Sequence, residues 1–60
     1  PMAFFIQLRM RHACRLLDLS DRPVKIVALE TGYSDPYYFS RVFKKAMGLS
    51  PEKYRAIKKG

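Results

Sequence analysis

One stretch, GYSDPYYFSRVFKKAMG at residues 32–48, decides how this chain folds. Gly32 is typical of a helix C-terminus, because glycine adopts the left-handed conformation that often ends a helix. Asp35 followed by Pro36 is typical of a helix start, since aspartate caps free N–H groups and proline suits the first turn. Gly48 repeats the stop signal. The stretch therefore predicts a tight turn between two helices, the second of which begins at Pro36 and ends before Gly48.

Apolar periodicity predicts a helix on each side of this pair, and no segment shows convincing strand alternation. The expected helices span residues 2–19, 24–31, 36–47 and 52–58, the last after a Ser50-Pro51 start signal. Their predicted apolar faces are Phe5, Ile6, Met10, Ala13, Leu16 and Leu17 in the first, Val24, Val27, Ala28 and Thr31 in the second, and Phe39, Val42, Phe43 and Ala46 in the third. The pattern indicates an all-α, four-helix, homeodomain-like helix-turn-helix unit. It occupies residues 1–60: a long helix (1–19), the helix-turn-helix (23–47) and a terminal helix (51–58).

The charge balance gives the first indication of function. Among 60 residues, 12 are Lys or Arg and 5 are Asp or Glu, for a net charge of +7 and a pI near 10.0. A compact basic domain favours polyanionic partners, either nucleic acid or an anionic membrane surface. A merely solvated basic surface is the alternative that composition alone leaves open.

The helix predicted at residues 36–47 concentrates this charge. On a helical wheel, Tyr37, Arg41 and Lys44 share one outer face, with Tyr38 and Lys45 alongside and no acidic residue among them. An arginine fork can read guanine in the major groove, and the second helix of a helix-turn-helix lies there. Tyr37, Tyr38 and Arg41 are therefore the predicted base contacts, although Tyr38 borders the core and packing there is its alternative.

Other polar side chains lie where DNA phosphates would pass. The predicted phosphate contacts are Ser34, Ser40, Lys44, Lys45, Lys53 and Arg55.

Several other classes of function find no support in the residues. Cys14 is the only cysteine, which excludes an internal disulfide, and His12 is two positions from it, so the pair points to different helix faces. We expect His12 at the surface and Cys14 buried or half-buried. No catalytic constellation, phosphate-binding glycine loop, metal site or cofactor site is expected, and no apolar run reaches the length of a membrane span. Arg9, inside the apolar stripe of the first helix, is predicted to pack its stem and bond a carbonyl or an acid.

At this point the sequence resembles a known family. Residues 32–45, then Gly48-Leu49-Ser50-Pro51 and Tyr54-Arg55, are similar to the signature of AraC/XylS-type transcriptional regulators. The upstream residues Pro1, Phe4, Phe5, Arg9, Met10, Ala13, Leu16 and Leu17 resemble that family's linker helix. The resemblance implies a DNA-binding unit whose partner is duplex DNA, within a DNA-binding domain made of two helix-turn-helix units joined by the linker helix.

The same resemblance implies that the chain is a fragment of a larger bacterial regulator. Residues 1–4 (Pro-Met-Ala-Phe) echo residues 51–54 (Pro-Glu-Lys-Tyr), as expected if Pro1 closes a preceding unit. The resemblance further implies a cytoplasmic, nucleoid-associated protein that can contact RNA polymerase. Its effector would bind a domain absent here.

A protein-docking module is the rival prediction. Ile26 and Leu29 stand where the family often has polar residues, and Phe4 and Leu8 lie opposite the main apolar stripe of the first helix. These four side chains would be the anchors. Salt-steep binding to mixed-sequence DNA would distinguish a DNA-binding unit from a docking module.

Overall fold

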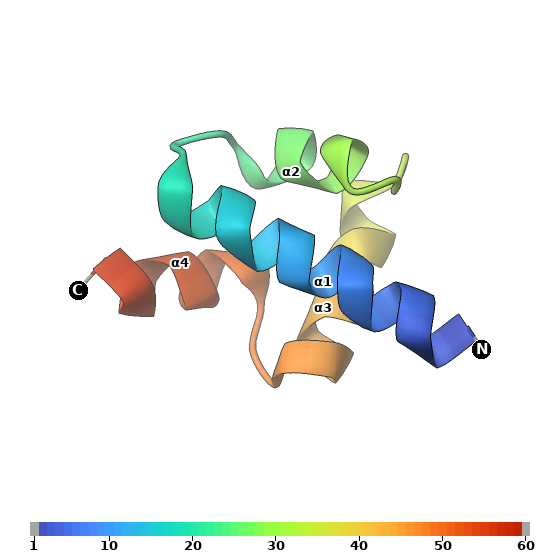
Figure 1. The fold of residues 1–60 in the computed structure, drawn as a ribbon. Helices are drawn as coiled ribbons and strands as arrows, with labels where there is room; N and C mark the ends of the chain where they lie inside the picture. The colour runs from blue at the N-terminus through green and yellow to red at the C-terminus, as the bar shows by residue number, and fades with distance from the viewer. Residues whose placement is uncertain (1, 60) are drawn as a thin grey trace.

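Four helices form the described part of the chain: α1 (Met2–Leu19), α2 (Val24–Glu30), α3 (Pro36–Met47) and α4 (Pro51–Lys59). The computed structural model describes the backbone of residues 2–59 and the side chains of residues 5–57. The expectations for Pro1 and for the side chains of Phe4 and Lys58 lie outside these described residues. α1 runs across the molecule and packs against each of the other three helices, as Figure 1 shows. The predicted all-α fold is confirmed over residues 2–59, where no strand occurs.

Capping residues set the helix boundaries as predicted. Oδ1 of Asp35 accepts a hydrogen bond from the backbone N–H of Tyr37 at 2.9 Å, which satisfies a free donor at the start of α3. Gly48 ends α3 with a φ of +90°, a conformation that side chains other than glycine rarely adopt. Oγ of Ser50 accepts from the N–H of Lys53 at 3.3 Å and so caps α4. α4 begins at Pro51, the first residue of the terminal helix predicted at residues 51–58.

The turn between α2 and α3 is fixed by backbone hydrogen bonds. Gly32, with a φ of +97°, donates its N–H to the carbonyl of Leu29 at 3.1 Å. The next residue, Tyr33, donates to the carbonyl of Ala28 at 2.8 Å. This pair of bonds is the Schellman arrangement, which satisfies the last carbonyls of a helix while reversing the chain. The glycine that the sequence marked as a helix stop therefore lies where the chain turns from α2 towards α3.

The core lies where α1 crosses the other helices. Its buried members are Met10, Ala13, Cys14, Leu17, Val27, Ala28, Tyr33, Phe39 and Phe43. Two positions predicted on apolar faces are wrong: Phe5 is 60% exposed, and Ala46 is also exposed. Phe5 lies near the N-terminal end of α1, which projects past α3 in Figure 1. Ala46 lines a shallow cavity of about 220 Å³ between α1 and α3, so the two helices do not cover it.

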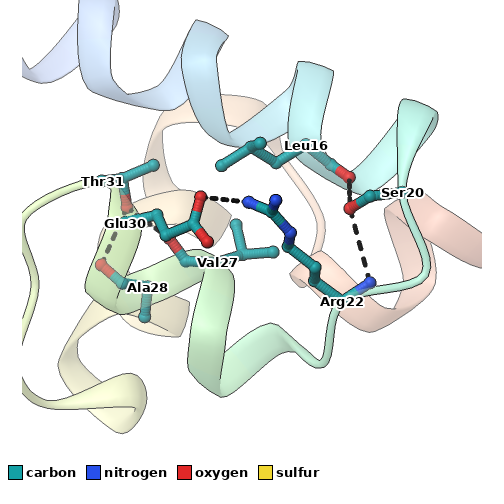
Figure 2. A network of polar contacts seen from close by, with 7 residues as sticks. All are labelled: Leu16, Ser20, Arg22, Val27, Ala28, Glu30 and Thr31. Carbon is teal, nitrogen blue, oxygen red and sulfur yellow. Dashed lines mark hydrogen bonds and ion pairs between the residues drawn. The ribbon is translucent and has the colours of Figure 1, made fainter.

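Polar contacts tie α1 to α2, as Figure 2 shows. Ser20 donates from Oγ to the carbonyl of Leu16 at 2.7 Å and accepts from the N–H of Arg22 at 3.4 Å. The Arg22 guanidinium then pairs with the Glu30 carboxylate at the far end of α2. Both side chains are exposed, so the ion pair stabilises the fold by about 1 kcal/mol at most. The buried Thr31 hydroxyl lies 3.0 Å from the carbonyl oxygens of both Val27 and Ala28, which satisfies it.

Candidate nucleic-acid interface

Aromatic packing determines which face of α3 turns outward. Phe39 and Phe43 are fully buried, and their ring centroids lie 5.9 Å apart. Phe43 also contacts the ring of Tyr54 on α4, edge to face, at 5.6 Å. Aromatic pairs at these separations add to the free energy gained by burying the rings. Because these two phenylalanines fix one side of α3 to the core, the residues on the opposite side must face solvent.

Tyr37 and Arg41 lie together on that outer side, one helical turn apart. Tyr37 is 69% exposed, and its hydroxyl oxygen accepts a hydrogen bond from Nη1 of Arg41 at 3.4 Å. The Arg41 guanidinium carbon lies 5.9 Å from the centroid of the Tyr37 ring. These contacts are the i to i+4 pairing that helix geometry allows. They hold the guanidinium over the tyrosine ring while leaving most of its N–H groups available.

A hollow of about 620 Å³ opens along the same helix. It is lined by Tyr38, Arg41, Val42, Lys44 and Lys45. The structure thus brings the predicted base contacts Tyr38 and Arg41 together with the lysines predicted to contact phosphates. Tyr38 is 57% exposed, but one side of its ring faces the buried Tyr33 at a centroid distance of 6.0 Å. It therefore lies at the border between the core and the surface, as the sequence predicted.

The cations of α3 keep their charge available to a partner. Among the side chains of residues 5–57, the one ion pair is Arg22–Glu30, which joins a residue just before α2 to the last residue of α2. No acid therefore pairs with Arg41, Lys44 or Lys45 within this part of the chain. The outer face of α3 consequently carries unneutralised positive charge, which suits an anionic partner.

The remaining predicted phosphate contacts fall in three places. Ser34 is exposed in the turn before α3, Ser40 is half-buried on α3, and Lys53 is exposed on α4. Arg55 differs: its Nε donates to the carbonyl of Leu17 and its Nη2 to the carbonyl of Ser20, each at 3.2 Å. These two bonds fasten α4 to the end of α1. The structure thus gives Arg55 a joining role, and we leave it out of the proposed phosphate contacts.

Arg9 is a residue whose surroundings the sequence did not predict. It is exposed, and its guanidinium lies over the ring of Tyr33, 5.6 Å from the centroid. Its contact is thus an aromatic face, in place of the predicted carbonyl or acid. The partner comes from the turn between α2 and α3. Helical periodicity carries no information about that pairing.

Tyr54 has a perturbed pKa. Loss of hydration on burial, followed by the influence of the Cys14 thiol and the Asp18 carboxylate, raises the pKa of Tyr54 from 10.0 to about 12. Its hydroxyl donates to Oδ2 of Asp18 at 3.4 Å.

Cys14 is buried and His12 exposed, as predicted. Within the described residues no three His, Cys, Asp or Glu side chains are grouped to hold a metal ion.

The anchors of the rival docking prediction are exposed where the structure describes them. Leu29 is 51% exposed, and Ile26 and Leu8 are also accessible, whereas the Phe4 side chain lies outside the described residues. Ile26 and Leu29 belong to α2 and Leu8 to α1. Over the described part of the chain, none of the helices combines the length and the apolar character needed to cross a membrane.

Comparison with known protein sequences shows a consistent set of relatives. A family described as a helix-turn-helix domain matches residues 1–57. The chain is 53% identical over 55 residues to the MmsAB operon regulatory protein of Pseudomonas aeruginosa and 44% identical over 48 residues to the arabinose operon regulatory protein of Escherichia coli. These matches cover 92% and 80% of the chain. They cover only 18% and 16% of the two relatives, so the chain spans less than a fifth of their length.

Solved structures agree with this assignment. The C-terminal domain of AraT, a response regulator from Geobacillus stearothermophilus, superimposes with a TM-score of 0.91 at 39% identity, over 93% of this chain and 46% of that one. A DNA-binding transcriptional dual regulator from Escherichia coli K-12 superimposes with a TM-score of 0.86 at 30% identity, over 90% of this chain and 49% of that one. The chain therefore belongs to the helix-turn-helix family of AraC-type transcriptional regulators.

Proposed function

We propose that this unit binds duplex DNA with α3 in the major groove. The observation that carries the proposal is the outer face of α3, which is basic, aromatic and unpaired with any acid of the described residues. This helix is also the second of a pair joined by a tight turn, the position that a recognition helix occupies. The protein-docking function rests on scattered exposed apolar residues and is not favoured by the relatives.

We assign the contacts by their place along α3. Tyr37 and Arg41 lie on the first two turns, the part of a recognition helix that meets base edges, and Tyr38 lies beside them. Arg41, held by Tyr37, has the planar fork that suits guanine. The proposed phosphate contacts surround this centre: Ser34, Ser40, Lys44, Lys45 and Lys53.

Two single substitutions test which side chains contact base edges and which contact phosphates. Arg41→Ala should weaken binding to a duplex selected from a random library by about 1–3 kcal/mol and barely affect a scrambled duplex. Lys45→Ala should weaken both duplexes equally and lower the slope of log K against log salt by about one unit. Fluorescence anisotropy titrations at several salt concentrations measure both. If Arg41→Ala weakened both duplexes equally, Arg41 would be a phosphate contact and base reading would pass to the tyrosines.

The wider setting follows from the relatives by analogy. We propose that the chain acts within a longer, cytoplasmic and nucleoid-associated transcription regulator, with its effector bound elsewhere in that protein and RNA polymerase as a further partner. Its role is binding rather than catalysis, since the relatives are named as regulators. Detection of the chain in a promoter-bound complex with RNA polymerase would test the last of these partners.

A further inference from the structure

Arg9 reaches from α1 to the turn that joins α2 to α3. Its guanidinium carbon lies 5.6 Å from the centroid of the Tyr33 ring. A carbon added at Gly32 in place of its hydrogen would lie 3.8 Å from the same guanidinium, at ordinary van der Waals distance. Arg9 therefore contacts Tyr33 and lies beside Gly32, the preceding residue of the turn. Its charged group contacts the point where the chain reverses towards α3.

Tyr33 connects this contact to the DNA-facing helix. Tyr33 is 9% exposed, and its ring centroid lies 6.0 Å from that of Tyr38 and 5.6 Å from that of Phe39. Its backbone N–H closes the turn by donating to the carbonyl of Ala28. Tyr38 lines the hollow on the outer face of α3, and Phe39 anchors α3 in the core. The ring of Tyr33 thus contacts Arg9 and also the first turn of α3.

We propose that Arg9 is a positioning residue for DNA reading: it fixes Tyr33, and through Tyr33 the orientation of Tyr38 and of the first turn of α3. The inference rests on the proposed binding of DNA through α3. A guanidinium stacks on an aromatic face through its flat surface and its charge, which fixes the ring while the group itself remains hydrated. Because the first turn of a recognition helix faces the base edges, a small displacement there alters base contacts before it alters the fold.

The preference of the protein for one duplex sequence over another shows whether Arg9 positions α3 or only stabilises the fold. A variant that is only less stable has a smaller folded fraction, so it binds every duplex more weakly by the same factor. The ratio between the affinities for a preferred and a scrambled duplex then stays constant. A displaced α3 changes that ratio, while the phosphate contacts of Lys44 and Lys45, and with them the salt slope, are retained.

The test uses the 60-residue chain, a random duplex library and two matched variants. Arg9→Ala and the control Arg15→Ala each remove one exposed arginine from α1, and only Arg9 touches the turn. Arg9→Ala should lower the ratio between the affinities for the preferred and the scrambled duplex by about two- to fivefold, the effect of losing one cation–π contact. The slope of log K against log salt should not change. Arg15→Ala should keep the parent ratio.

Amide hydrogen exchange on the free protein supplies a second readout. Arg9→Ala should speed exchange at the Tyr33 N–H, which closes the turn, but not at the Tyr54 N–H, which donates to the carbonyl of Ser50 just before α4. A parent that binds no duplex overturns the proposed function itself. A parent that binds, with a ratio that Arg9→Ala leaves unchanged, overturns the role of Arg9 alone, as does a parent without any sequence preference. A narrowed ratio with unchanged exchange at Tyr33 overturns the route through that ring.

Discussion

At the scale of single residues, a few side chains with long-range contacts hold the unit together. Phe43 contacts Phe39 within α3 and Tyr54 on α4. Arg55 joins α4 to the carbonyls of Leu17, in α1, and Ser20, just after it. A chain of 60 residues buries a smaller share of its surface than a larger domain does. Each buried ring therefore contributes a large fraction of the total stability.

Phe43→Ala should cost about 3–5 kcal/mol, comparable to the whole stability of a domain this small. The matched control is Phe5→Ala, at a phenylalanine that is 60% exposed, which should cost less than about 1 kcal/mol. Circular dichroism should show a largely unfolded Phe43→Ala chain and a nearly unchanged Phe5→Ala melting curve. Similar melting of both variants would mean that the buried face of α3 is assigned to the wrong residues.

Tyr54 should make stability depend on pH in the alkaline range. Its folded pKa is about 12 and its ordinary value 10.0, so below pH 10 both folded and unfolded chains keep the proton. Between pH 10 and 12 the unfolded chain loses it first, which favours unfolding. The free energy of unfolding of the parent should therefore fall relative to that of Tyr54→Phe as pH rises from 9 to 11. Urea denaturation measures it, and parallel pH profiles would contradict the raised pKa.

At the scale of elements, the bounds of α3 were the most predictable, because the residues that start and end this helix act on nearby backbone groups. Asp35 and Gly48 act on backbone groups within a few residues, so the sequence predicted both ends. The pairing of α2 with α3 was predictable for the same reason. The extent of the apolar faces was not, because periodicity marks a stripe without showing how much of it a neighbouring helix covers. Phe5 and Ala46 are exposed for this reason.

At the candidate site, the sequence likewise did not predict the contacts that Arg9 and Arg55 make with other elements. The sequence identified Tyr37, Arg41 and Lys44 as one face, since residues at this spacing adjoin on any helix. It could not identify the partners of the two arginines, which lie on other helices or in the turn. Those partners depend on how α1 crosses the rest of the molecule.

The start of α3 should depend on its cap. Asp35→Ala should destabilise the chain by about 1 kcal/mol, since the N–H of Tyr37 loses its acceptor. For a domain of this size that loss lowers the melting temperature by roughly 4–8 °C. Asp35→Asn removes the charge but keeps a capping oxygen, so it should melt close to the parent. If Asp35→Asn melted as low as Asp35→Ala, the carboxylate charge rather than the cap would stabilise α3.

At the scale of the whole molecule, exposed positive charge lies on more than one helix. Besides the α3 cations, α1 carries the exposed Arg11 and Arg15. A general electrostatic attraction would involve the cations of both helices, whereas a docked α3 would bring mainly its own cations to the phosphates. Counterion release distinguishes these cases, because the salt slope counts the phosphates that are contacted.

The most direct test of the account compares two charge-matched double variants binding one duplex across a salt series. Lys44→Ala/Lys45→Ala removes two positive charges from α3, and Arg11→Ala/Arg15→Ala removes two from α1. If α3 docks on DNA, the α3 variant should lower the slope of log K against log salt by about two units and the α1 variant should leave it nearly unchanged. Equal losses of slope in both variants, or a parent whose affinity hardly responds to salt, would contradict binding through α3.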